Sequence, residues 1–176
     1  MMPRVGLFNS LLEWFSPSYQ EHETIASATS GKVVITGVIE TLEEAEALLC
    51  PLTGEPAVVV HYMGRASGMA SRAYGIIGDG MEIVTRAHQG RDFLLRDSSG
   101  AALIRVEPGE DLIQLHGRMF ETHGIEMKAE TDYLAPGERV TVQGKVIERH
   151  SAGSPHRRAP YQVVVKADSI TRVEED

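Results

Sequence analysis

The sequence predicts a mainly β protein: a small closed, OB-like β-barrel with short helical additions and an amphipathic helix near the N-terminus. Three observations lead to this prediction: many short apolar strands separated by regular turn signals, two strands that each contain a glycine, and an N-terminal run with helical spacing of apolar residues. We expect residues 1–30 to form the helix and a linker, and residues 31–176 to form the barrel domain.

The N-terminal run, residues 5–16, places apolar side chains on one stripe of a helix that ends before Pro17. The N-terminal stripe consists of Leu7, Phe8, Leu11, Leu12 and Phe15, with Trp14 beside them. It would pack either on the chain's own barrel or into a groove of a partner protein. A membrane-surface helix would carry Lys and Arg on its polar face, and this one offers only Arg4. The stripe is therefore the predicted partner-binding site, while peripheral membrane contact stays open.

Two predicted strands, residues 32–40 and 139–149, contain a glycine among β-branched residues, Gly37 in the first and Gly144 in the second. A glycine inside a strand weakens it and indicates a bulge or a sharp bend. Small closed sheets need such bends where one strand turns a corner and pairs with two neighbours. We therefore expect both strands to curve the wall of the barrel.

The remaining elements follow from local signals. Thr41 and Glu44 fit a capping box, which predicts a short helix over residues 42–49. Turn residues at 97–100 predict a hairpin between strands at 92–96 and 101–106. The other predicted elements are strands at 57–62, 81–88, 161–167 and 169–173, a helix within 110–124, and a turn at Pro136-Gly137.

The composition is that of an ordinary globular domain, with 42% hydrophobic and 24% charged residues. No apolar run approaches the roughly 20 residues that span a bilayer. The net charge of -8 argues against nucleic acid as a partner, because proteins that bind the phosphate backbone usually carry a basic face. Cys50 is the single cysteine, so intramolecular disulfides are excluded and we expect a cytoplasmic protein.

No motif identifies a reaction. Cys50 lacks the local signature of a cysteine protease, and the chain has no Gly-x-Ser-x-Gly elbow. The seven histidines form no His-x-x-x-His pair, so local spacing assembles no metal site. The glycine-rich segment 64–80 lacks the Gly-Lys-Ser/Thr ending of a P-loop and is expected to be a loop. We therefore expect no enzymatic activity, cofactor or metal; a hydrolase assembled from distant residues is the least favoured rival.

The loop at 148–161 is the most basic stretch of the chain. Its candidate ligand-binding residues are Arg149, His150, His156, Arg157 and Arg158. Loops between the strands of small five-stranded barrels commonly bind single-stranded nucleic acid, but such binding also needs stacking aromatic residues, which make up only 6% of this chain. A solvated hairpin tip is the favoured interpretation, and a site for a small ligand or single-stranded nucleic acid is the alternative.

Three features, in this order, resemble the GIDE-type domain. The first is Gly31 with its short strand, followed by Pro51 and Gly54 before a hydrophobic strand. The second is Phe93, Leu94 and Asp97, which lead through Gly100 to a strand that ends near Pro108. The third is the turn Pro136-Gly137, which precedes the strand with Val142 and Gly144. The resemblance covers about residues 30–150.

GIDE-type domains occur in MULAN-type mitochondrial ubiquitin ligases, between transmembrane segments, and in many bacterial and archaeal proteins. The resemblance implies that the corner "CPLTGEP" is structural, with no catalytic residue in it. Because this sequence has neither flanking hydrophobic spans nor a RING, we do not expect ligase activity. The resemblance instead implies a freestanding domain that recognises other proteins, as a subunit or adaptor of a larger prokaryotic assembly.

Overall fold

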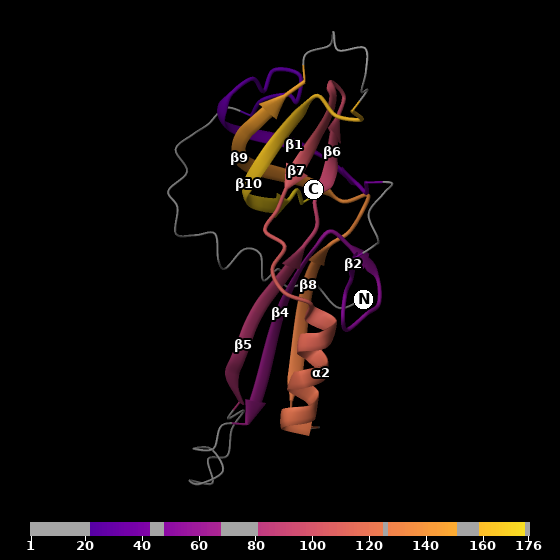
Figure 1. Cartoon of the computed structure of the whole chain (residues 1–176), viewed down its shortest axis with the longest axis vertical. Coiled ribbons are helices and arrows are strands. Elements are labelled where there is room, and N and C mark those ends of the chain that lie inside the picture. The colour runs from indigo at the N-terminus through magenta and orange to yellow at the C-terminus, as the bar shows by residue number, and fades with distance from the viewer. Residues whose placement is uncertain (1–21, 43–47, 68–80, 125–126, 151–158, 175–176) are drawn as a thin grey trace.

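The computed structural model describes residues 22–42, 48–67, 81–124, 127–150 and 159–174. They form two lobes along one long axis, a closed five-stranded barrel and a three-stranded sheet with one helix (Figure 1). The predicted mainly β fold with a closed barrel is confirmed. The predicted helix over residues 5–16 lies outside the described residues.

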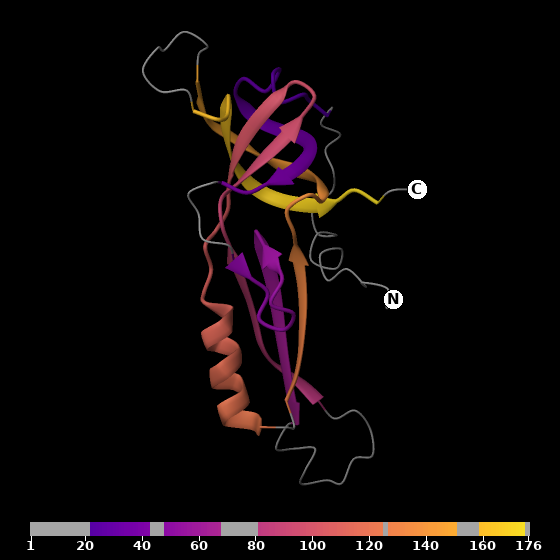
Figure 2. The same ribbon diagram turned by 90° about the vertical axis from the view of Figure 1, so that its right-hand side faces the viewer.

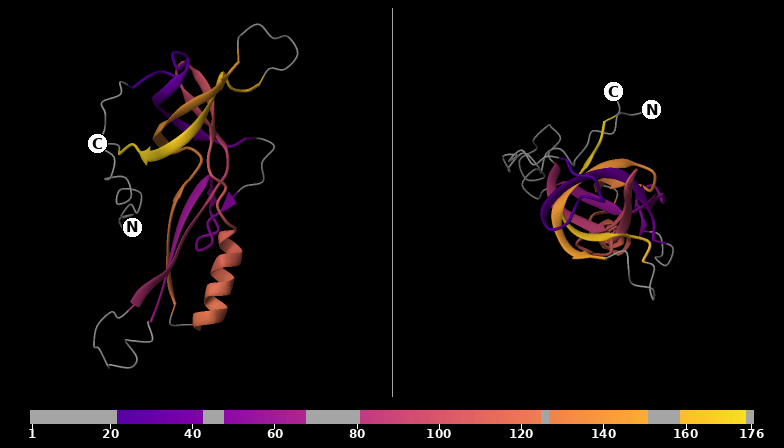
Figure 3. Two further views of the ribbon diagram at one scale, coloured as in Figure 1. Left: turned by 60° about the vertical axis from the view of Figure 1, so that its left-hand side comes forward. Right: turned by 90° about the horizontal axis from the view of Figure 1, so that it is seen from above.

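The barrel closes in the order β1-β6-β7-β10-β9. Its strands are β1 (Gly31–Glu40), β6 (Phe93–Asp97), β7 (Gly100–Arg105), β9 (Arg139–Arg149) and β10 (Val163–Arg172). Neighbouring strands are antiparallel except β7 and β10, which run parallel. Viewed from above, the strands wrap around a closed ring, as in an OB-like barrel (Figure 3).

Alternate side chains of the strands fill the barrel, because successive residues of a strand point to opposite faces. The interior includes Ile35, Phe93, Leu95, Ile104 and Val142, all fully buried. Ile25 and Ala28, from a turn before β1, join the same core. The interior of the barrel is therefore filled by side chains of the described strands.

The two glycines sit where the barrel wall bends. β1 pairs with β9 up to Val38 and with β6 from Val38 onward, so it changes partners next to Gly37. A Cβ at Gly37 would lie 2.5 Å from the Arg96 carbonyl oxygen, and one at Gly144 would collide with the Lys166 carbonyl oxygen. The pairing of β10 with β9 also shifts register opposite Gly144. The close approach of a neighbouring main chain explains why each of these two positions holds a glycine.

The second lobe is built from two insertions between barrel strands. β2 (Leu48–Leu49), β3 (Pro56–Ala57), β4 (Val59–Ser67) and β5 (Met81–Gly90) lie between β1 and β6, whereas α2 (Leu112–His123) and β8 (Lys128–Leu134) lie between β7 and β9. The sheet order is β5-β4-β8, and α2 runs along one face of this sheet (Figure 2). Its core includes Leu48, Val60, Tyr62, Leu112 and Tyr133.

Most predicted elements are confirmed, including the helix within 110–124, which forms α2 from a cap at Asp111 to Gly124. The helix expected over 42–49 is wrong at its end, because Leu48 and Leu49 pair with β3 as a strand; residues 43–47 lie outside the described residues. The two strands expected near the C-terminus are one, β10, with register shifts within it. β8 was not predicted.

Candidate functional site

The predicted partner-binding residues Leu7, Phe8, Leu11, Leu12, Trp14 and Phe15 lie outside the described residues, as do His156, Arg157 and Arg158 of the basic loop. The structure therefore places only Arg149 and His150 of the predicted site residues.

Arg149 and His150 both make contacts within the chain. The Arg149 guanidinium donates to the carbonyl oxygens of Ala28 and Ala26, at 3.3 Å each. His150 Nε2 lies 3.4 Å from a Glu148 carboxylate oxygen, and the His150 ring packs edge-on against Tyr161. Arg149 thus holds the turn that closes one end of the barrel.

Asp97 holds the same turn from the other side. Its carboxylate accepts hydrogen bonds from the Ile25 amide at 2.8 Å and from the amides of Ser99 and Gly100, as well as from the Ser99 hydroxyl. Partial burial raises the pKa of Asp97, but these hydrogen bonds outweigh burial and lower the pKa below its ordinary value. The carboxylate is a structural acceptor.

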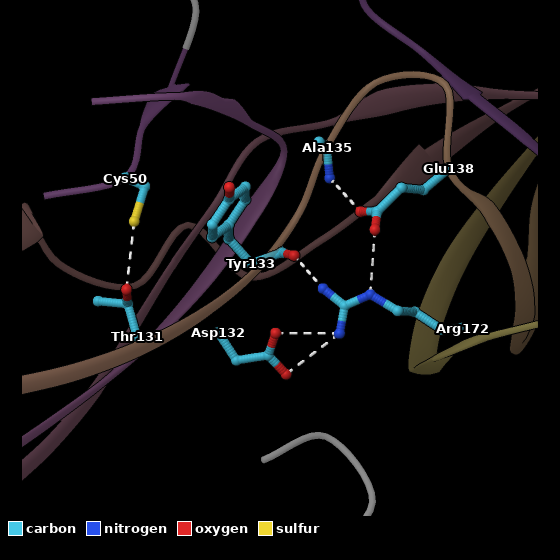
Figure 4. A network of polar contacts seen from close by, with 7 residues as sticks. All are labelled: Cys50, Thr131, Asp132, Tyr133, Ala135, Glu138 and Arg172. Atoms are coloured by element: carbon cyan, nitrogen blue, oxygen red, sulfur yellow. Dashed lines mark hydrogen bonds and ion pairs between the residues drawn. The ribbon is translucent and has the colours of Figure 1, made fainter. Parts of the chain in front are cut away.

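A polar network joins the two lobes around Arg172, near the end of β10 (Figure 4). The Arg172 guanidinium lies 2.9 Å from Asp132 of β8 and 3.1 Å from Glu138, and it donates to the Tyr133 carbonyl oxygen. Glu138 in turn accepts from the Ala135 amide at 2.6 Å. We call Arg172, Asp132 and Glu138 the lobe junction, in which one guanidinium pairs with two carboxylates at the boundary between barrel and sheet.

Cys50 lies in the corner "CPLTGEP", inside the core of the sheet lobe. Its side chain is buried, and Sγ is 3.3 Å from the Thr131 hydroxyl (Figure 4). Burial raises the pKa of Cys50, but hydrogen bonds from Thr131, Thr53 and the main chain outweigh it and lower the pKa. The main chain closes this corner with hydrogen bonds between Cys50 and both Gly54 and Glu55. A buried thiol in such a turn packs as a small core residue.

Three histidines of the sheet lobe, His61, His88 and His116, contact other side chains. His61 of β4 is in register with His88 of β5 and Asp132 of β8, with ring centroids of the histidines 6.2 Å apart. Burial and the neighbouring His88 lower the pKa of His61, while Asp132 raises it. His116 Nδ1 lies 2.8 Å from the hydroxyl of the buried Tyr62. Within the described ranges, no group of three His, Cys, Asp or Glu side chains could hold a metal ion.

Part of the outer face of β6 and β7, where OB-fold proteins bind oligonucleotides, is apolar here. Leu94 and Leu103 are buried on this face together with Val164 of β10, and Leu42 and Tyr161 pack against them. Leu42 comes from the connection after β1 and Tyr161 from the loop between β9 and β10. The chain's own side chains therefore cover this face.

In comparisons with known proteins, no family model matches the chain, and no curated protein matches it. In the part of the chain that the structure describes, no helix is long and apolar enough to cross a membrane.

Proposed function

We propose that this protein is a non-catalytic module of the GIDE type that binds another protein, as a subunit or adaptor of a larger prokaryotic assembly. The observation that carries the proposal is an exposed apolar pair on α2. Ile113 and Phe120 are 55% and 54% exposed and lie seven residues apart, on one face of the helix. Leu112 and Leu115 of the same helix are buried against the sheet, so this helix presents apolar side chains on two faces.

The N-terminal stripe is the second proposed contact, because buried apolar anchors dominate the energetics of interfaces. The stripe and the α2 pair together would give a partner two apolar surfaces on one chain. Neither surface requires chemistry at a reacting atom, which fits a scaffold whose buried polar groups serve to hold turns and lobes together.

The proposal is tested by recovering partners on a tagged full-length chain from cells of its source. Removing residues 1–16, or replacing both Ile113 and Phe120 with glutamine, should lower recovery of the same partner. Glu121→Gln on the same helix is the matched control, since it changes an exposed residue without removing apolar area. Unchanged recovery with both variants would overturn the proposal.

The rival function is an OB-like barrel that binds a small ligand or single-stranded nucleic acid through the loop at 148–161. The barrel connectivity favours it, because this architecture commonly serves that purpose. The apolar cover over Leu94 and Leu103 weighs against it. Salt-sensitive binding of single-stranded oligonucleotides that depends on Arg157 and Arg158 would favour this rival.

A further inference from the structure

Four cations lie side by side on the outer wall of the barrel. The strand register places Lys32 of β1 opposite Lys145 of β9, Lys145 opposite Lys166 of β10, and Lys166 opposite Arg105 of β7. All four side chains are exposed. Their chain neighbours Val33, Val146, Val165 and Ile104 belong to or pack against the barrel core. We call these four residues the cation row; it follows the closed barrel around four of its five strands, from β1 through β9 and β10 to β7.

The charges of the row are compensated at one end only. Arg105 lies 2.7 Å from Asp92, and Lys166 lies 3.7 Å from Glu107. Among the described residues, no ion pair is found for Lys32 or Lys145. Like charges directly opposite each other destabilise a sheet, so this arrangement lowers the stability of the free protein. Because the chain has 25 acidic residues and a net charge of -8, its composition does not explain a row of four cations.

We propose that Lys32 and Lys145, the uncompensated end of the cation row, bind an acidic α-helix of a partner protein that lies across β1 and β9. Neighbouring strands are about 4.8 Å apart, and side chains at i and i+4 of a helix are about 5–6 Å apart. Because the wall of the closed barrel curves away on both sides, one straight helix faces only neighbouring strands, and carboxylates at i and i+4 of its acidic face can meet Lys32 of β1 and Lys145 of β9. Ile147, two residues beyond Lys145 on β9, is 55% exposed and offers an apolar contact beside the row. The inference rests on the proposed function and names the chemistry of the partner.

A protein partner fits the row better than nucleic acid does. Single-strand binders stack bases on aromatic side chains beside the basic groove. The positions two residues along the strand from Lys32 and Lys145 hold none: Ser30, Val34, Gln143 and Ile147. Tyr161 packs at the other end of the row, against the cluster of Leu103 and Val164. The net charge of -8 also repels a long polyanion, whereas a short acidic helix meets mainly the local field.

The test measures binding of a fluorescent synthetic helix, with glutamates at i, i+4 spacing among alanines and leucines, to the full chain by fluorescence anisotropy at about 50 mM salt. Lys32→Glu with Lys145→Glu should weaken binding by about tenfold or more. The matched control is Arg86→Glu with Lys128→Glu, which changes the net charge equally on exposed residues of the sheet lobe. It should leave the affinity within about twofold, and a lysine-bearing helix should bind the row variant better than the native chain. Circular dichroism checks that both variants are folded.

Equal weakening in the two double variants would overturn the proposal, because net charge alone would then explain the binding. Tighter, row-dependent binding of a single-stranded oligonucleotide of matched charge would overturn the choice of ligand. The outcome is separable from the proposed function. If the peptide fails while partner recovery still depends on residues 1–16 or on the α2 pair, only the cation row is refuted. If the peptide binds the row while recovery is insensitive to both apolar surfaces, the proposed function with its two apolar contacts is overturned and the peptide result stands by itself.

Discussion

Single side chains hold together segments that lie far apart in the sequence. Asp97 accepts from the Ile25 amide, 72 residues away, and Arg149 donates to the carbonyl oxygens of Ala26 and Ala28 from more than 120 residues away. Together these two side chains fix the turn that seals the barrel end over its core. The charged groups of Asp97 and Arg149 therefore stabilise the closed end of the barrel, and each contributes separately to the free energy of unfolding.

Asp97→Asn tests how much the Asp97 carboxylate contributes to the stability of the fold. The folded pKa of Asp97 lies below its ordinary value of 3.8, so the carboxylate contributes stability that is fully present above that value and is lost as the pH falls through the folded pKa. We expect the variant to lose about 2 kcal/mol of unfolding free energy at pH 7. The difference from the native chain should narrow below about pH 4. Urea unfolding at pH 7, 5 and 3 measures both.

Ser98→Ala is the control for Asp97→Asn. Ser98 is exposed in the same turn, and we expect no measurable change at any of the three pH values. A loss in Asp97→Asn that stays constant from pH 7 to pH 3 would show that the ionised carboxylate is not the source of the effect.

At the scale of the strand, close approach of main chains decides which positions must be glycine. A methyl group at Gly144 would meet the Lys166 carbonyl oxygen of the neighbouring strand, whereas Gly117 on α2 has open space around a Cβ. We expect Gly144→Ala to lower the free energy of unfolding by about 3 kcal/mol, because the main chain of β10 has to move. Gly117→Ala should raise it by about 1 kcal/mol through helix propensity. Thermal unfolding of the two variants gives the comparison, and a milder loss in Gly144→Ala than about 1 kcal/mol would mean that β10 yields easily.

The cation row makes a second prediction at this scale. Lys145→Glu places a carboxylate between Lys32 and Lys166, so two repulsive pairs become attractive. We expect the free energy of unfolding to rise by about 0.5 kcal/mol at low salt. The gain should shrink as salt screens the exposed pairs. Chemical denaturation at about 0.05 and 1 M sodium chloride measures it. Arg86→Glu, at an exposed position of the sheet lobe opposite Met63, is the control with the same change in charge and should change stability little. A loss of stability in Lys145→Glu would contradict repulsion within the row.

Sequence patterns predicted the elements whose signal is local and left out those that depend on register. The two glycine-bearing strands, the hairpin at 97–100 and α2 each carry their own pattern of turn, cap or alternation. β8, "KAETDYL", begins with four residues that hold three polar side chains and becomes buried only from Asp132 onward. Likewise, Lys32, Lys145 and Lys166 look unrelated in the sequence, because only the pairing of β1, β9 and β10 aligns them.

At the scale of the whole molecule, the sheet lobe is attached to the barrel through a narrow junction. The Val58 amide donates to the Leu134 carbonyl oxygen, and the Val58 carbonyl oxygen accepts from the Arg91 amide. Val59 and Leu134 belong to the barrel core. Asp132 of the lobe junction is the only buried polar or charged residue among the residues that the structure describes. No local pattern could predict this site, since Arg172 lies 40 residues from Asp132 and 34 from Glu138. These few contacts decide whether the two lobes unfold as one unit.

Arg172→Ala tests this coupling. The substitution removes a cation from beside Asp132, whose side chain is 7% exposed, and an uncompensated buried charge costs about 3 kcal/mol. Because Asp132 and the Tyr133 carbonyl belong to β8, the loss should fall on the sheet lobe. We expect hydrogen exchange to show reduced protection of β4 and β8 in the variant, with β1 and β9 nearly unchanged.

Arg96→Ala is the control: it removes an exposed ion pair with Glu40 and should cost less than about 1 kcal/mol of unfolding free energy. An equal fall in protection across both lobes would mean that the molecule unfolds as a single unit even without Arg172, and that the barrel depends on the sheet lobe for its own stability.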